Sequence, residues 1–203
     1  DLAKQQIFAF DTESTGLDAM LADIVGLSFC YAAGTAYYVP TPLDKNEAQK
    51  VIDLFKPILE NPNISKVGQN IKYDILLLDK YGIKVQGQLF DTMLAHYLID
   101  PDTRHGMDIL AETYLNYIPV SITELIGAKG KNQGNMRDVA VEQVKEYAAE
   151  DADITWQLYN TFAPLLKESN TYNLAEEVEF PLVHVLAEIE KNGVKIDIDT
   201  LNA

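Results

Sequence analysis

The stretch "IFAFDTESTGLD", residues 7–18, begins as an apolar run and then presents two acidic residues separated by one position. Its apolar and aromatic start is typical of a strand buried in a sheet. Side chains at positions i and i+2 of a strand project from the same face. Asp11 and Glu13 are therefore expected to converge at the C-terminal end of the first strand, where open α/β sheets bind their ligands. Two solvated loop carboxylates are the simpler alternative.

The composition is that of an ordinary globular protein. The chain has 203 residues, of which 47% are hydrophobic and 23% charged, and this length suits one main domain. A single cysteine, Cys30, excludes an internal disulfide framework and is typical of a reducing cytoplasm. No apolar run is long enough to cross a bilayer, and residue 1 does not begin a signal peptide, so we expect no membrane partner.

The chain is strongly acidic, with a formal net charge of −15 and a sequence pI of about 4.4. This charge argues against a general nucleic-acid binder, whose affinity comes mostly from basic side chains on phosphates. An acidic protein can still process nucleic acid when its carboxylates hold divalent cations, because the cations supply local positive charge. Affinity for the substrate would then have to come from elsewhere.

Residue patterning predicts an α/β domain with a mixed sheet. Three strands that open the chain as a meander are followed by strands alternating with helices. "LIGAKGKNQGN", residues 125–135, is rich in Gly, Lys and Asn and is expected to be a mobile surface loop. Asp91 is predicted as the N-cap of a helix, and Gly82 as a helix stop. The predicted strands cover 6–11, 24–31, 36–40, 64–70 and the start of 87–99, and the predicted helices 46–59, 71–82, the rest of 87–99, 107–116, 138–168 and 173–191.

Two further acidic residues stand in helical segments. Asp74 lies in "VGQNIKYDILLL", residues 67–78, one turn after Asn70, and the simplest interpretation is a helix capped by Asn70 with Asp74 on its surface. In "EYAAEDADITWQLY", residues 146–159, Tyr147 and Asp151 are spaced i, i+4 and share a helix face. The other acids of that segment are expected to face solvent: Glu146, Glu150 and Asp153.

Taken in order, the strand-end D-x-E, the N-x-x-x-D and the Y-x-x-x-D resemble the three motifs of DnaQ-like 3′–5′ exonucleases, within the ribonuclease H-like superfold. The sequence around these motifs resembles the proofreading exonuclease domain of bacterial family A DNA polymerases, DNA polymerase I. The segments that carry this resemblance are "FAFDTE", "VGQNIKYD", "FDTMLAHYL", "GAKGKN", "YAAEDADIT" and "EKNGVKID". The similarity runs over essentially the whole chain. It implies a mixed five-stranded sheet flanked by helices.

The resemblance also implies a site with two divalent cations, Mg²⁺ or Mn²⁺, held by four acids: Asp11, Glu13, Asp74 and Asp151. In this family's arrangement Asp11 bridges both ions, Glu13 and Asp151 complete one site, and Asp74 supports the other, partly through water. Tyr147 is expected to orient the attacking water, because its ordinary pKa near 10 makes it a poor base at neutral pH. Carboxylate oxygens suit these hard cations.

Several residues are candidate substrate contacts. Leu17 either wedges against the terminal base, as its position does in the family, or simply packs. Tyr73 either stacks beside the substrate or packs in the core, and Asn70 either bonds near the scissile phosphate or caps a helix. Further candidates for contact with the single strand are Thr12, Gln69, Arg104, His105, Lys129 and Lys131, although the two lysines could equally be solvated loop charges.

The sequence thus predicts a bacterial, cytoplasmic 3′–5′ DNA exonuclease domain over residues 1–190, acting on a single-stranded 3′ end. Residues 191–203 are expected to lead into a polymerase domain of the same parent chain. That domain would supply the affinity for DNA that an acidic domain lacks. Two alternatives remain open. One is an RNA-trimming exonuclease of the ribonuclease D kind, and the other is a non-catalytic scaffold for a polymerase.

Overall fold

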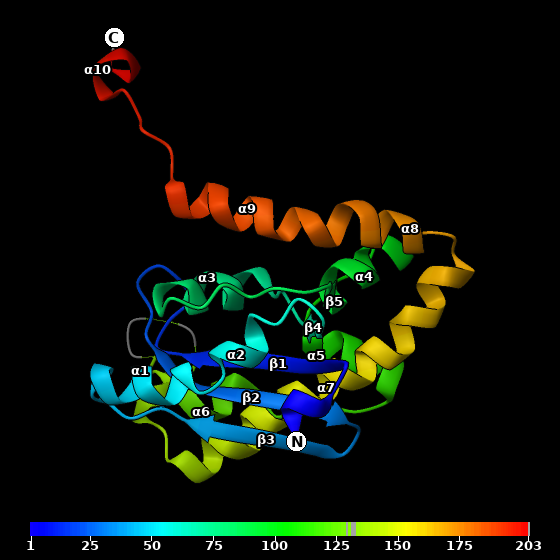
Figure 1. Ribbon diagram of the computed structural model, residues 1–203, viewed down its shortest axis with the longest axis horizontal. Coiled ribbons are helices and arrows are strands. Elements are labelled where there is room, and N and C mark those ends of the chain that lie inside the picture. Colours follow the sequence, from blue (N-terminus) through cyan, green and yellow to red (C-terminus); the bar gives the residue numbers. More distant parts are fainter. Residues whose placement is uncertain (129, 131–132, 203) are drawn as a thin grey trace.

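A five-stranded mixed sheet forms the centre of the molecule in the computed structural model, which describes residues 1–128, 130 and 133–202. The strand order is β3-β2-β1-β4-β5 (Figure 1). β1, β2 and β3 form an antiparallel meander, whereas β4 and β5 run parallel to β1. The predicted mixed five-stranded sheet is confirmed. The strands span Ile7–Ser14 (β1), Ile24–Ala32 (β2), Thr35–Pro40 (β3), Ser65–Gly68 (β4) and Leu89–Asp91 (β5).

The central position of β1 explains the apolar run that opens it. Phe8, Ala9 and Phe10 are all fully buried, on both faces of the strand. A strand with neighbours on both sides and helices over both faces has no solvated side, so its sequence does not alternate. β1 extends to Ser14, beyond the predicted end at residue 11, and therefore includes the acidic positions.

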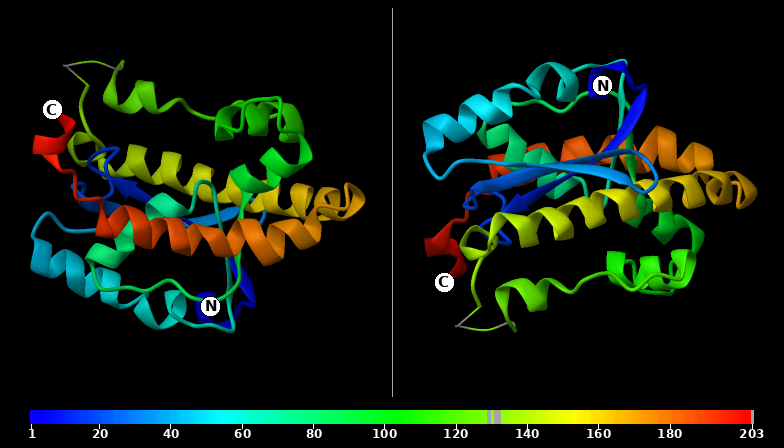
Figure 2. Two further views of the ribbon diagram at one scale, coloured as in Figure 1. Left: turned by 90° about the horizontal axis from the view of Figure 1, so that it is seen from above. Right: turned by 90° about the horizontal axis from the view of Figure 1, so that it is seen from below.

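Helices cover both faces of the sheet. The long helix α7 packs against β1, β2 and β3, while α3 lies on the opposite face with α9 outside it (Figures 1 and 2). Ion pairs fasten α9 to α3, from Lys72 to Glu190 and from Lys191 to Asp79. The helices span Lys45–Asp53 (α1), Lys56–Leu59 (α2), Lys72–Lys80 (α3), Thr92–Ile99 (α4), Met107–Leu110 (α5), Ile122–Ile126 (α6), Val141–Glu168 (α7), Tyr172–Leu174 (α8), Phe180–Asn192 (α9) and Ile198–Leu201 (α10).

Three predicted helices are interrupted. The helix predicted over 46–59 is split into α1 and α2, because the ring of Pro57 cannot follow a continuous helix through the preceding turn. The segments 107–116 and 173–191 each contain a π-helical turn, at Ala111–Leu115 and Ala175–Glu179. Such a turn leaves no clear signal in the spacing of apolar residues.

The connection from β4 to α3 is tight and brings the second acidic motif to the sheet. A Cβ atom on Gly68 would lie 2.7 Å from Cγ1 of Ile71, so only glycine fits at the end of β4. Asn70 follows with a φ of +57°, a left-handed conformation that asparagine tolerates better than most residues. The helix then begins at Lys72 and ends before Gly82, whose φ of +73° confirms the predicted stop.

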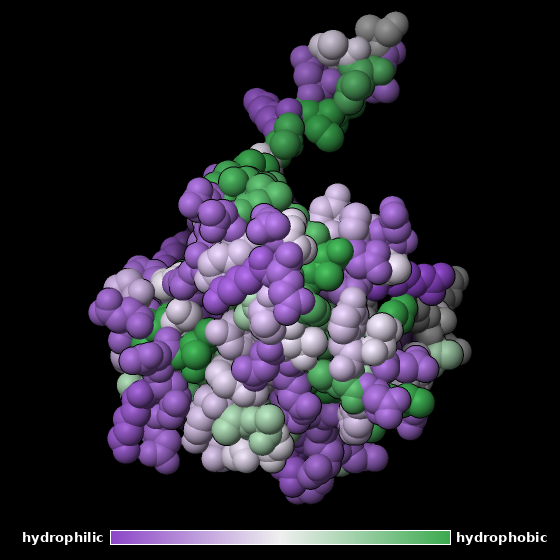
Figure 3. Space-filling view, turned by 90° about the vertical axis from the view of Figure 1, so that its right-hand side faces the viewer, coloured by the Kyte–Doolittle hydropathy of each residue, from purple (hydrophilic) through white to green (hydrophobic). Residues whose placement is uncertain are grey.

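The C-terminal segment projects away from the sheet layers. Gly193, with a φ of +66°, ends α9, and the following residues lead to α10. The exposed side chains of this arm include Val194, Ile196 and Ile198, and Figure 3 shows apolar residues along much of it. Among the described residues, no helix combines the length and the apolar character needed to cross a membrane.

Candidate active site

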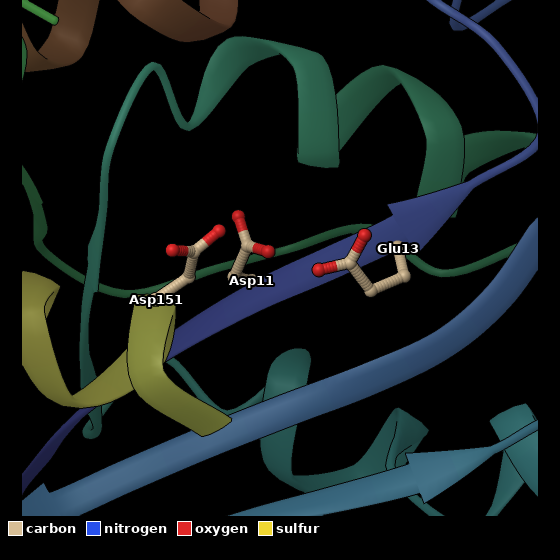
Figure 4. Close-up of side chains that lie close together, drawn as sticks. All are labelled: Asp11, Glu13 and Asp151. Atoms are coloured by element: carbon tan, nitrogen blue, oxygen red, sulfur yellow. The ribbon is translucent and has the colours of Figure 1, made fainter. Parts of the chain in front are cut away.

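Three carboxylates meet at the end of the central strand. Asp11 and Glu13 come from β1 and Asp151 from α7, and each offers an oxygen atom within 4.8 Å of the others (Figure 4). The convergence predicted from the D-x-E spacing is confirmed. Glu13 is only 6% exposed, so the alternative of two solvated loop acids is wrong.

Asp74 lies next to this cluster instead of on the surface. Its side chain is 2% exposed, and its Oδ1 atom accepts hydrogen bonds from the backbone N–H of Thr12, at 3.0 Å, and from the Thr12 hydroxyl. The interpretation of Asp74 as a surface acid is therefore wrong. Because Thr12 stands between Asp11 and Glu13, this contact brings the second acidic motif against the first.

Asn70 does not cap α3, which corrects another expectation. The N-cap position is Ile71, which has no side-chain capping bond, and the side chain of Asn70 is exposed. Asp91 instead holds the backbone just before the helix, accepting the N–H groups of Asn70 at 3.2 Å and of Ile71 at 2.9 Å. It also accepts the Met93 N–H at 2.9 Å, which confirms it as the predicted N-cap of α4. One carboxylate thus orders the starts of two helices.

The electrostatics of the four acids favour the uptake of positive charge. Burial raises the pKa of Asp11 from 3.8 to about 7. Burial, and then the neighbouring carboxylates, raise the pKa values of Glu13, Asp74 and Asp151 well above their ordinary range. These groups repel one another when ionised, so a cation that binds among them would relieve the repulsion.

Tyr147 lies one helical turn before Asp151 on α7, as predicted. Burial first, and then the charge of Asp151, raise the pKa of the Tyr147 hydroxyl. The ring packs against a small apolar cluster that includes Val25, Met136 and Val144. Tyr147 therefore stays protonated at neutral pH and can act as a hydrogen-bond donor from a fixed position.

The residues present fit a divalent cation. Oε1 of Glu13 is buried and has no hydrogen-bond partner within the part of the chain that the structure describes. An unpaired buried carboxylate oxygen is costly and needs a partner such as a metal ion. The cluster consists of carboxylate oxygens, the donors that Mg²⁺ and Mn²⁺ prefer over nitrogen and sulfur.

Leu17 and Tyr73, two candidate substrate contacts, differ in their surroundings. Leu17 is 94% exposed, so the interpretation of Leu17 as a packing residue is wrong. Tyr73 packs against the core, and its hydroxyl contacts Ser14 Oγ at 2.5 Å and the carbonyl of Gly16. Tyr73 thereby ties the loop that carries Leu17 to α3.

The remaining predicted substrate contacts are distributed differently. Thr12 is 7% exposed and is engaged by Asp74. Gln69 donates to the carbonyl of His105 at 2.8 Å and accepts from the hydroxyl of Thr92. Arg104 is exposed, in the loop between α4 and α5. Contacts of these residues with a substrate stay predictions, and Lys129 and Lys131 lie outside the described residues.

Two acids that were expected to face solvent are structural anchors. Glu150 accepts the Val120 N–H at 2.8 Å and the hydroxyl of Tyr117. Asp153 accepts the Gly34 N–H at 2.7 Å, which fastens the turn between β2 and β3 to α7. Their spacing from Asp151 gave no sign of this role, because the partners come from distant segments.

Solved structures share this fold. Brucella melitensis NrnC aligns with a TM-score of 0.77 and 20% identity, over 98% of this chain and 92% of that chain. The POL domain of Pol1 from M. smegmatis, in a complex with DNA primer-template and dNTP, aligns with a TM-score of 0.74 and 22% identity, over 99% of this chain and 31% of that chain. These likenesses show the fold of this chain, a five-stranded mixed sheet flanked by helices, and the acidic cluster lies at the end of its central strand.

Sequence comparison narrows the class to a family. Residues 1–167 match the family described as 3′-5′ exonuclease, and the chain belongs to this family. DNA polymerase I of Pseudomonas aeruginosa is 39% identical over 210 residues, which cover 98% of the chain and 23% of that protein. The chain spans less than a quarter of the length of the first curated relatives, at 23% and 22%, and both of these relatives are DNA polymerase I.

Proposed function

We propose that this chain hydrolyses the terminal phosphodiester of a frayed, single-stranded 3′ end of DNA and releases nucleoside 5′-monophosphates. The observation that supports this most is the meeting of Asp11, Glu13 and Asp151 at the end of β1, with an unpaired buried oxygen on Glu13. Retention of all the acids argues against a non-catalytic scaffold.

Asp11, Glu13, Asp74 and Asp151 would hold two divalent cations, Mg²⁺ or Mn²⁺. Bound there, the cations would neutralise charge on the phosphodiester, favour an ionised water and stabilise the departing 3′ oxygen. Thr12 keeps Asp74 in place through two hydrogen bonds. Tyr147, held in its protonated form, would donate a hydrogen bond that orients the attacking water.

Exposed residues around the acids would bind the single strand. Leu17 would wedge against the terminal base, since its side chain is 94% exposed on the loop that Tyr73 ties to α3. Arg104 would contact a phosphate, because guanidinium groups match phosphate geometry. We assign supporting contacts to Thr12, Gln69, Asn70, Tyr73 and His105.

The domain would work beside a polymerase domain of the same parent chain, in the bacterial cytoplasm. The net charge of −15 opposes DNA binding, so a partner that grips the duplex would deliver the frayed end. We place the nuclease domain at residues 1–190, because the ion pairs of Glu190 and Lys191 with α3 lie at this boundary, near the end of α9. Residues 191–203 would begin the connection to the polymerase domain.

The proposal is tested by digesting a 5′-labelled single-stranded DNA with Mg²⁺ or Mn²⁺ present. Asp151→Ala should abolish digestion, and its circular dichroism spectrum should show that the fold is unchanged. Glu146→Ala is the matched control, because Glu146 stands on the same helix with its side chain 77% exposed. Equal digestion by Asp151→Ala and the parent would contradict the assignment of Asp151.

A second comparison separates DNA from RNA as the substrate. The parent protein is assayed on DNA and RNA strands of matched sequence, and digestion of the DNA should be faster. Faster digestion of the RNA would favour the ribonuclease D-like alternative.

The role of Tyr147 is tested with Tyr147→Phe on the same strands. This substitution should lower kcat more than it raises KM, because the hydroxyl acts on the water and not on the strand.

A further inference from the structure

Two histidines and a tyrosine form a hydrogen-bonded chain outside the acidic cluster. His96 of α4 is 2% exposed. Its Nδ1 atom lies 2.7 Å from Nδ1 of His105, and its Nε2 atom lies 3.0 Å from the hydroxyl of Tyr114. His105 belongs to the loop of residues 100–106, between α4 and α5, which we call the arginine loop because it carries Arg104.

The arginine loop borders the acidic site. Its carbonyl at His105 accepts a hydrogen bond at 2.8 Å from Gln69, which directly follows β4. β4 pairs with β1 in parallel, so Gln69 lies at the same edge of the sheet as Asp11. At the other end of the loop, α5 begins close enough for the charge of Asp108 to raise the pKa of Asp151.

Besides the Gln69 bond to its His105 carbonyl, the arginine loop is held, among the described residues, mainly by the side chain of His105. Arg104 is exposed, and no ion pair joins it to an acid in the ranges that the structure describes. The Thr103 hydroxyl reaches the carbonyl of Asp100 only at 3.4 Å, a bond within the loop itself. The buried anchor of the arginine loop is thus His96, which bonds to His105 on one side and Tyr114 on the other.

We propose that His96 is a positioning residue for the exonuclease reaction: it fixes His105, and through His105 it holds Arg104 toward the backbone of the single strand. The proposal rests on the proposed function for the role of Arg104. It assigns no contact with the substrate to His96, which is buried.

The hydrogen bond between His96 and His105, which we call the link, depends on the protonation of the two rings. Two Nδ1 atoms at 2.7 Å can share only one hydrogen, so one ring must donate and the other must accept. A proton on both Nδ1 atoms breaks the bond. The groups that face His96 are His105, Tyr114 and Asp100, and α7 contributes the ring of Phe162. Burial lowers the pKa of His96, which favours the neutral ring and an intact link. The link is lost on acidification, once both Nδ1 atoms carry a proton.

Limited proteolysis tests the anchoring without any need for nuclease activity. Trypsin cleaves after Arg104 only when the arginine loop can leave its place, and mass spectrometry identifies that cut. His96→Ala should raise the initial rate of this cut about tenfold, as expected for the loss of one or two hydrogen bonds. In His96→Gln the glutamine can still bond His105, so trypsin should cleave this variant after Arg104 at nearly the parent rate. His184→Ala, in α9 and away from the loop, is the matched control, and an unchanged rate in His96→Ala overturns the proposal.

Kinetics of digestion test whether His96 acts through Arg104. Arg104→Ala should lower kcat/KM about tenfold, mainly through KM, as expected for the loss of one charge-assisted hydrogen bond. His96→Ala should do the same, and the double variant should be no worse than Arg104→Ala alone. Independent losses that multiply in the double variant would overturn the proposal, as would an unchanged KM in His96→Ala.

The pH profile separates positioning from a purely structural role. The ratio of kcat/KM for His96→Gln to that of the parent should rise as the pH falls from neutrality into the acid range, since glutamine keeps the bond and cannot take up a proton. The ratio cancels the titration of the carboxylates, which both proteins share. A ratio that stays flat overturns the link between His96 and acid sensitivity. A parent that digests no DNA would instead contradict the proposed function, and proteolysis would still decide the anchoring.

Discussion

Thr12 and Asp74 are 62 residues apart in the chain, and Asp74 accepts both the backbone N–H and the hydroxyl of Thr12 on one carboxylate oxygen. The two residues lie on β1 and at the start of α3. This contact fixes the distance between the second acidic motif and the first. Both bonds go to the Oδ1 atom of Asp74, so the other carboxylate oxygen would be the one to bind a cation.

Thr12→Val tests this contact. Valine keeps the shape of threonine and loses the hydroxyl, so Asp74 would keep only the bond from the backbone. We expect kcat to fall roughly tenfold, equivalent to about 1.4 kcal/mol, because the carboxylate is less well fixed. The measurement is steady-state digestion of single-stranded DNA with saturating Mg²⁺. An unchanged kcat would mean that the backbone bond alone positions Asp74.

Thr155→Val provides the matched control and a prediction of its own. Thr155 of α7 is fully buried, and its hydroxyl has no hydrogen-bond partner among the described residues. Removal of an unpaired buried hydroxyl at constant shape should raise the free energy of unfolding by about 1 kcal/mol and leave digestion unchanged. Urea denaturation should show a higher midpoint with the same m-value. A lower midpoint would indicate that the hydroxyl has a partner in solution.

The site was predictable where its geometry is local. Asp11 and Glu13 follow from the two-residue period of a strand, and Tyr147 and Asp151 follow from the turn of a helix. Burial of Asp74 was not predictable, because it depends on how α3 packs against β1. The prediction that Asn70 caps α3 is wrong for the same reason, since the carboxylate that holds the backbone there, Asp91, comes from a strand and lies 20 residues after Ile71.

The fold was predictable to a similar degree. The order of strands and helices follows from apolar periodicity and from the Gly and Pro positions. The short α6 and α10, of 5 and 4 residues, were missed because they are too brief to show a period. The roles of Glu150 and Asp153 as anchors depend on loops that reach α7 only in the folded protein.

Leu17→Ser tests the wedge assigned to the exposed loop. Because Leu17 is 94% exposed, the substitution should leave the melting temperature unchanged. Digestion of a single strand should slow several-fold, since part of an apolar side chain of this size would be covered by the terminal base. Leu21→Ser is the matched control, because Leu21 is 80% exposed in the same loop and has no assigned role. If Leu17→Ser and Leu21→Ser slowed digestion equally, the assignment of Leu17 as a wedge against the terminal base would be wrong.

The stability of the metal-free protein should depend on pH through the buried carboxyl group of Asp11. The pKa of Asp11 is about 7 in the folded protein against 3.8 as its ordinary value, so the folded state binds more protons between these limits. The stability that comes from the protonated form is present below about pH 4 and is lost as the pH rises toward 7. With EDTA present, we expect the free energy of unfolding to fall across this window, by on the order of 2 kcal/mol.

Divalent cations should reverse this trend, because they bind the ionised carboxylates and not the protonated ones. The rise in melting temperature on addition of Mn²⁺ should therefore grow from pH 5 to pH 8. Asp11→Asn removes one buried charge, so it should stabilise the metal-free protein at pH 8 and reduce the effect of Mn²⁺. Asp18→Asn, at an exposed position, should change neither quantity. Thermal unfolding with and without the cation checks both, and a Mn²⁺ effect that persists undiminished in Asp11→Asn would place the cation elsewhere.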